Sequence, residues 1–201
     1  MHLELWKLSK DLLLDILPKT ADAYFAKNIG FGTGHNFSLL DDSKRKHILE
    51  IMRESKEYFP EGLGEGLGHS LPSTGSRLVE EVMQTTGSVN LARGATRGVT
   101  ESFIYLNLAG VHGILEYAAF NPEYGKVLGE GLADKFAVLD EEKQSWILDS
   151  LQKKSNFSKM FAKMIHKIMV CLSPQIRERI KGLAAKFPHL EIELEKARYG
   201  Q

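Results

Sequence analysis

Gly62-Leu63-Gly64-Glu65-Gly66-Leu67-Gly68 is the stretch that decides the fold, because glycine occupies every second position in it. In a helix interior, each glycine costs about 1 kcal/mol relative to alanine, so several in one helix need an offsetting interaction. Small residues four apart share one face of a helix, where they let a neighbouring backbone approach closely. Small residues recur at this spacing in the pairs Gly30/Gly34, Gly64/Gly68, Thr96/Thr100 and Gly129/Ala133. The sequence therefore predicts a layer of tightly packed helices.

These pairs belong to a longer repeat, which becomes visible when the chain is written in rows. The first two row starts differ by 34 residues and the later ones by 33, the starts being Tyr24, Tyr58, Leu91, Tyr124 and Phe157. One column is apolar throughout: Phe37, Leu71, Phe103, Phe136 and Met169. A second is apolar after its first member: Thr33, Leu67, Val99, Leu132 and Ile165. A third is glycine except in the last row: Gly32, Gly66, Gly98, Gly131 and Met164. Such fixed-period similarity indicates a tandem repeat.

Each row predicts a pair of helices. The second helix has a clear start, because Asp41, Asp140 and Ser173 stand where an N-cap is expected, with acidic residues or Pro174 directly after. The fold class is therefore all-α, a single repeat domain over 1–201 of about five tandem helical-hairpin units. The units span 24–57, 58–90, 91–123, 124–156 and 157–189, with a capping helix at 1–23 and a charged tail or last short helix at 190–201.

In layout the chain resembles the α-solenoid class, the TPR-like and HEAT-like arrays of helical hairpins. The resemblance covers about residues 24–189 and rests on the period and the hairpin layout. The glycines occupy different positions within the repeat from those of a TPR, and the bulky residues expected of a TPR are missing. The class implies stacked units, either as an open α-solenoid-like superhelix or as a compact right-handed helical stack. In the last row the positions of the small pair are Ala162 and His166, and the glycine column becomes Met164. This departure is expected of a unit without a further neighbour.

Composition narrows the classes of function. Lys+Arg and Asp+Glu both number 26, and this balance argues against a nucleic-acid partner, which normally requires a basic excess. No stretch approaches the ~18 uncharged apolar residues of a membrane span, so no membrane association is expected. The single cysteine, Cys171, lies among apolar residues and is expected to be a buried thiol. We expect a cytoplasmic protein without a cofactor; the oligomeric state stays open.

Two polar columns lie on the first helices, four residues apart and thus on one face. One column alternates in charge after its first member: Phe31, Glu65, Arg97, Glu130 and Lys163. The other contains His35, His69, Glu101, Asp134 and Lys167. The simplest interpretation is a ladder of ion pairs between neighbouring units on a solvated face, each worth about 0–1 kcal/mol.

The same columns allow a sharper interpretation. His35, His69 and Glu101 are side chains that can ligate a metal, and His69 with Glu101 could transfer a proton. No HExxH, CxxC or ExxH spacing supports a metal, and no phosphate-loop motif accompanies the glycines. A flat apolar ligand on the glycine-lined face is a further alternative to tight packing.

We therefore expect a non-catalytic protein-binding or scaffold module with an unidentified protein partner. Its binding face would comprise His35, Glu65, His69, Arg97, Glu101, Glu130 and Asp134. The alternative is a small-ligand or metal-binding protein, or an enzyme, with its site around His35, His69 and Glu101.

Overall fold

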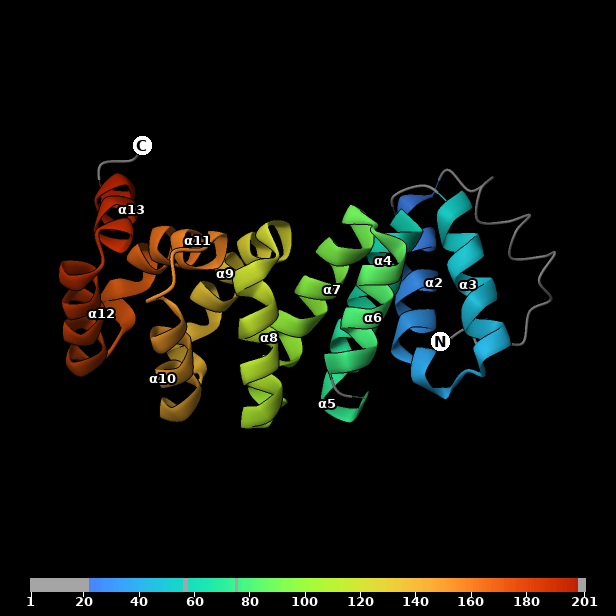
Figure 1. Cartoon of the computed structure of the whole chain (residues 1–201), viewed down its shortest axis with the longest axis horizontal. Coiled ribbons are helices and arrows are strands. Elements are labelled where there is room, and N and C mark those ends of the chain that lie inside the picture. The colour runs from blue at the N-terminus through green and yellow to red at the C-terminus, as the bar shows by residue number, and fades with distance from the viewer. Residues whose placement is uncertain (1–21, 56–57, 75, 199–201) are drawn as a thin grey trace. The chain divides into compact units, whose positions relative to one another are not determined.

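The computed structural model describes residues 22–55, 58–74 and 76–198, and these residues are helical without a single strand (Figure 1). The chain divides into two compact units, unit 1 up to Tyr105 and unit 2 from Leu106. The elements of unit 1 are α2 (Ala23–His35), η2 (Phe37–Leu39), α3 (Asp42–Glu54), α4 (Tyr58–His69), α5 (Leu71–Thr74), α6 (Ser76–Thr86), α7 (Val89–Ser102) and η3 (Phe103–Tyr105). Those of unit 2 are α8 (Leu108–Phe120), α9 (Pro122–Lys135), η4 (Phe136–Val138), α10 (Glu141–Ser150), α11 (Asn156–Ile165), η5 (His166–Cys171), α12 (Pro174–Lys186) and α13 (Pro188–Arg198).

The all-α fold class is confirmed for the described residues, and the predicted capping helix at 1–23 lies outside them except for its last two positions. None of the helices in this part of the chain combines the length and the apolar character that a membrane span needs. The expected single domain and the boundaries of the five units stay predictions. The segment 190–201 begins within α13, so the alternative of a last short helix holds up to Arg198.

The second helices start where their N-caps were predicted. The side chains of Asp41, Asp140 and Ser173 accept hydrogen bonds from the backbone N–H groups of Lys44, Lys143 and Ile176 respectively. Each bond satisfies one of the backbone donors that the first turn of a helix leaves without a partner. The Lys143 Nζ also lies 2.7 Å from the Asp140 Oδ2, so this cap is an ion pair as well.

The Asp140 cap gives a prediction about stability. Replacing Asp140 with alanine is expected to lower the free energy of unfolding by about 1 kcal/mol, because α10 loses its capping acceptor. The lysine side-chain hydrogen bond, followed by the lysine backbone N–H, holds the pKa of the Asp140 carboxyl below its ordinary value. A depressed pKa stabilises the fold above the unfolded pKa, and this contribution is lost as the pH falls through the folded pKa.

The matched variant is Asp140→Asn, which keeps the capping oxygen without its charge. The wild type should exceed this variant in stability at neutral pH. The difference should begin to shrink near the ordinary carboxyl pKa of about 4 and should disappear only as the pH falls through the lower folded-state pKa. Thermal denaturation followed by circular dichroism between pH 3 and 7 measures both effects. A difference between the two proteins that does not change with pH would contradict the assignment.

The apolar columns of the sequence form the core. Ten side chains make up the two columns, and the members that are at most 2% exposed are Phe37, Leu67, Leu71, Val99, Phe103, Leu132, Phe136 and Ile165. Two of the buried phenylalanines also have their backbone carbonyls satisfied by the following helix. Arg45 Nε donates to the Phe37 carbonyl at 3.2 Å, and Gln144 Nε2 donates to the Phe136 carbonyl at 2.9 Å. Each short turn is thereby attached to its second helix.

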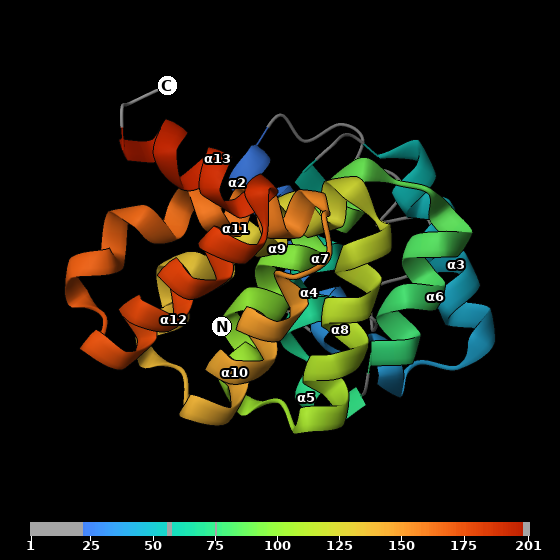
Figure 2. The same cartoon turned by 60° about the vertical axis from the view of Figure 1, so that its left-hand side comes forward.

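The glycines of unit 1 bring three first helices together at their backbones, with α4 between α2 and α7 (Figures 1 and 2). A Cβ atom on Gly34 would lie 2.0 Å from the Leu63 carbonyl oxygen, and one on Gly64 would lie 2.0 Å from that of Leu91. Glycines of α4 that face the preceding helix α2 are equally close to its backbone. A Cβ on Gly62 would lie 2.0 Å from the Lys27 carbonyl oxygen. No side chain fits in such contacts, which confirms that these glycines serve close packing.

The order of these contacts also fixes the direction of the helices. Gly30 approaches Phe59 and Leu63, whereas Gly34, one turn later, approaches Leu63 and Leu67. The contacts advance in the same sense along both helices, so α2 and α4 run parallel. The same rule holds for α4 and α7, because Gly64 approaches Leu91 and Gly68 approaches Ala95.

Helices of unit 2 also approach one another closely at glycines, although fewer glycines take part. A Cβ on Gly129 of α9 would lie 2.6 Å from the Phe157 carbonyl oxygen of α11. In the same unit, the rings of Phe136 and Phe161 meet edge to face with their centroids 5.3 Å apart. One expectation fails in this unit: Cys171 is exposed, because it stands at the end of η5 rather than inside a buried helix.

Candidate functional site

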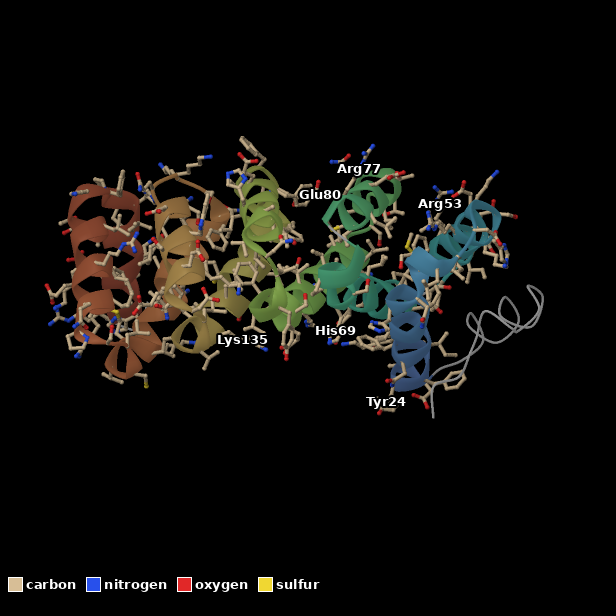
Figure 3. All side chains as sticks on the ribbon, turned by 90° about the horizontal axis from the view of Figure 1, so that it is seen from below. Tyr24, Arg53, His69, Arg77, Glu80 and Lys135 are labelled. Atoms are coloured by element: carbon tan, nitrogen blue, oxygen red, sulfur yellow. The ribbon has the colours of Figure 1, made fainter. Side chains whose placement is uncertain are left out.

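The close backbone packing of unit 1 presents one continuous face of side chains from three parallel helices. We call it the first-helix face, and its members are Phe31 and His35 of α2, Glu65 and His69 of α4, and Arg97 and Glu101 of α7. Phe31 and Glu65 are half-buried and the other four are exposed. Figure 3 shows His69 on the side of unit 1 opposite Arg53 and Arg77, which belong to the second helices. The side chains of the first-helix face therefore share one side of unit 1, and their role as a binding face stays a prediction.

Glu130 and Asp134, the remaining members of the predicted binding face, lie on α9 of unit 2. Both are exposed and stand one helical turn apart. Their side chains therefore share one face of α9, as the column spacing predicted.

Three aromatic rings meet at one end of the first-helix face. The ring of Phe31 stacks on that of His35, with an angle of 8° between their planes and 6.1 Å between their centroids. His69 of α4 completes the group, since its ring centroid is 5.7 Å from Phe31 and 5.6 Å from His35. Ring pairs at such distances attract one another beyond the effect of area burial. The two histidines are therefore held in a fixed arrangement at the surface.

Beside the rings lies a network of charges that joins all three helices. Lys27 Nζ is 2.8 Å from Glu65 Oε2 and 3.4 Å from Glu61 Oε1, and Glu61 also forms an ion pair with Arg97. The Glu61 side chain is 14% exposed, which shields its two ion pairs from the full screening of water. The predicted ladder paired Glu65 with Arg97, whereas the structure places Glu61 against Arg97.

Sequence reasoning missed Lys27 and Glu61, although a signal for them exists. Both occupy the same row position, one helical turn before Phe31 and Glu65, and their charges are opposite. A further polar column at this row position would have predicted the ion pair between Lys27 and Glu61. Because the helices touch at their backbones, a long side chain such as that of Lys27 reaches two carboxylates on α4.

The electrostatics of Lys27 follow from this position. Burial lowers the pKa of its ammonium, but the hydrogen bond and the charge of Glu65, together with Glu61, more than offset that effect, and the pKa is raised overall. Lys27 therefore stays charged at neutral pH. Four charges of the network, two of each sign, balance one another: Lys27, Glu61, Glu65 and Arg97.

A metal site would require a group of at least three ligating side chains close together. Within residues 22–55, 58–74 and 76–198, no three His, Cys, Asp or Glu side chains are grouped so that they could hold a metal ion. His35 and His69 lie together, but Glu101 does not complete a three-ligand set with them. Proton transfer between His69 and Glu101 stays a prediction.

Comparison of the chain with models of protein families, with curated proteins and with solved structures gave no significant match.

Proposed function

We propose that this chain is a non-catalytic protein-binding or scaffold module, built as a tandem array of helical-hairpin units, which binds a protein partner through the first-helix face. The order of elements supports the array. Five times in the described residues a helix is followed by a short helical turn and then a second helix, the first members being α2, α4, α7, α9 and α11. Stacked hairpins expose one helix of each pair along a continuous surface, where repeat proteins commonly bind.

The observation that carries the proposal is the group of three rings beside a neutralised set of charges. Aromatic side chains are enriched at protein interfaces, and the residues that contribute most to binding cluster where a partner excludes water. Phe31, His35 and His69 offer such an anchor, and the ion pairs of Glu61 hold the neighbouring groups in place. A protein partner also suits the zero net charge, which gives no general attraction for polyanions. The single cysteine is compatible with our further proposal of a cytoplasmic location.

The test begins with affinity capture on the full chain, followed by titration of the partner that is captured. Replacing His35 and His69 together with alanine removes two of the three rings from the surface. We expect the dissociation constant to rise about tenfold or more, as for the loss of hot-spot side chains.

The control is Arg77→Ala with Gln84→Ala, two exposed residues of α6 on the second-helix side. Figure 3 places Arg77 opposite His69, so this variant should bind the partner as the wild type does. The control should unfold at the temperature of the wild type. The histidine variant should unfold within a few degrees of it, because its altered side chains are exposed and only the ring contacts are lost. Equal affinity of the histidine variant and the wild type for every captured partner would overturn the proposal.

A further inference from the structure

A groove separates two second helices of unit 1, on the side of the unit opposite the first-helix face. It has a volume of about 310 Å³, at the lower end of the range for ligand sites. α3 and α6 make little direct contact with one another and instead flank this opening. Its lining consists of Phe37, Asp42, Arg45, Lys46, Leu49 and Arg53 on one side and Leu78, Glu81, Val82 and Thr85 on the other.

The two walls of the groove are helical stripes of matching period. Lys46, Leu49 and Arg53 stand three and four residues apart on α3, and Leu78, Val82 and Thr85 stand four and three apart on α6. Spacings of three and four repeat along one face of a helix, and they are the spacings by which helices pack in bundles. The groove therefore presents two parallel or antiparallel helix faces to whatever lies between them.

The floor of the groove is apolar. Phe37 and Val82 are buried beneath it, while Leu49 and Leu78 are half-buried and line its sides. Leaving these leucines partly exposed forgoes stabilisation, because burying a leucine fully gains roughly 1.5–3 kcal/mol. An apolar side chain inserted between the two helices would recover part of it.

The charges on the rim are not symmetric. On the α3 wall, Arg45 already has partners within the chain. Its Nη1 lies 3.6 Å from Asp42 Oδ1, and its Nη2 donates to the Ser38 carbonyl at 2.7 Å. Lys46 and Arg53 are exposed and have no ion pair among the described residues. They are seven residues apart, about 10.5 Å or two helical turns along α3. The opposite wall carries the exposed carboxylate of Glu81.

We propose that this groove binds an amphipathic helix of a partner protein, with an apolar stripe flanked by acidic residues two turns apart on the α3 side. The apolar floor would take the stripe, and the two acidic residues would face Lys46 and Arg53, as charges flank the seam of a coiled coil. Glu81 would repel a second acidic flank and so fixes which edge of the helix faces α3. The apolar floor and this carboxylate both disfavour a nucleic-acid strand, which would bring phosphates to either rim.

The test uses two synthetic 18-residue amphipathic helical peptides that share one apolar stripe. The first carries glutamate at two positions seven apart on one flank, and the second carries lysine at those positions. Fluorescence anisotropy with the full chain should show at least tenfold tighter binding of the glutamate peptide. Reversing the groove charges in Lys46→Glu/Arg53→Glu should invert this preference, since each peptide then meets the other sign of charge.

The charge-matched control is Arg93→Glu/Lys126→Glu, two exposed cations of α7 and α9 that do not line the groove, and it should keep the wild-type preference. Equal affinity of the wild type for both peptides, or no binding below about 1 mM, would overturn the proposal. So would tighter binding of a 20-nucleotide single-stranded RNA than of the glutamate peptide. A wild-type dimer in sedimentation equilibrium that Lys46→Glu/Arg53→Glu makes monomeric would mean that a second copy fills the groove, and would overturn it as well.

Discussion

Replacing Gly64 with alanine is expected to lower the free energy of unfolding by at least about 3 kcal/mol, a loss at the upper end of what overpacking causes. The added Cβ would lie 2.0 Å from the carbonyl oxygen of Leu91 and 2.7 Å from the backbone nitrogen of Ala95. Both atoms belong to the main chain of α7, so no side chain can rotate out of the way. Relief requires that α4 and α7 move apart, which also loosens the other contacts between them.

The matched control is Gly32→Ala in α2, where a Cβ meets no atom of the described residues within 4 Å. Alanine has the higher helix propensity, so this variant should gain roughly 0.5–1 kcal/mol. Urea denaturation of both variants measures the two changes against the wild type. If the two alanines had similar effects, the glycine of α4 would matter only for its helix propensity, and the packing account would be wrong.

Replacing Phe136 with alanine should cost about 3–5 kcal/mol, the usual range for truncating a buried phenylalanine. Phe136 is 0% exposed and packs edge to face against Phe161, which is also 0% exposed. Its loss leaves a cavity between the turn η4 and the helix α11. The backbone carbonyl of residue 136 keeps its hydrogen bond from Gln144, so the loss is one of packing alone.

Val138 provides the comparison within the same turn. Its side chain is 75% exposed, and Val138→Ala should change the stability by no more than about 0.5 kcal/mol. Thermal unfolding of the two variants, followed by near-ultraviolet circular dichroism of the aromatic side chains, separates the effects. A small effect at Phe136 would mean that the apolar column does not form the core of unit 2.

Much of the local structure could be predicted because single residues determine it. Asp41, Asp140 and Ser173 mark helix starts through the chemistry of their own side chains. The glycine pairs predicted backbone contact because the helix propensity that they sacrifice requires a compensating interaction. The polar columns correctly placed Phe31, His35 and His69 near one another, since equivalent positions of stacked helices are neighbours.

The features that could not be predicted depend on distances between helices, and the repeat columns do not specify these distances. Arg97 could have paired with Glu65 or with Glu61, one turn earlier, and only the offset between α4 and α7 decides in favour of Glu61. Cys171 lies in an apolar run whose helix changes to a tighter 3₁₀ form, which turns the thiol outward. The groove could not be predicted either, because the sequence does not specify the distance between α3 and α6.

The glycines of α4 also bear on how unit 1 acquires its structure. Four of the residues of this helix are glycines, at positions 62, 64, 66 and 68, so α4 is a poor helix in isolation. Its stability comes from the backbones of α2 and α7 on either side. Folding of the three helices should therefore be strongly cooperative: removal of α2 would melt α4, and α7 would lose its own partner in turn. The helix that is weakest by itself thus couples its two neighbours into one all-or-none folding unit.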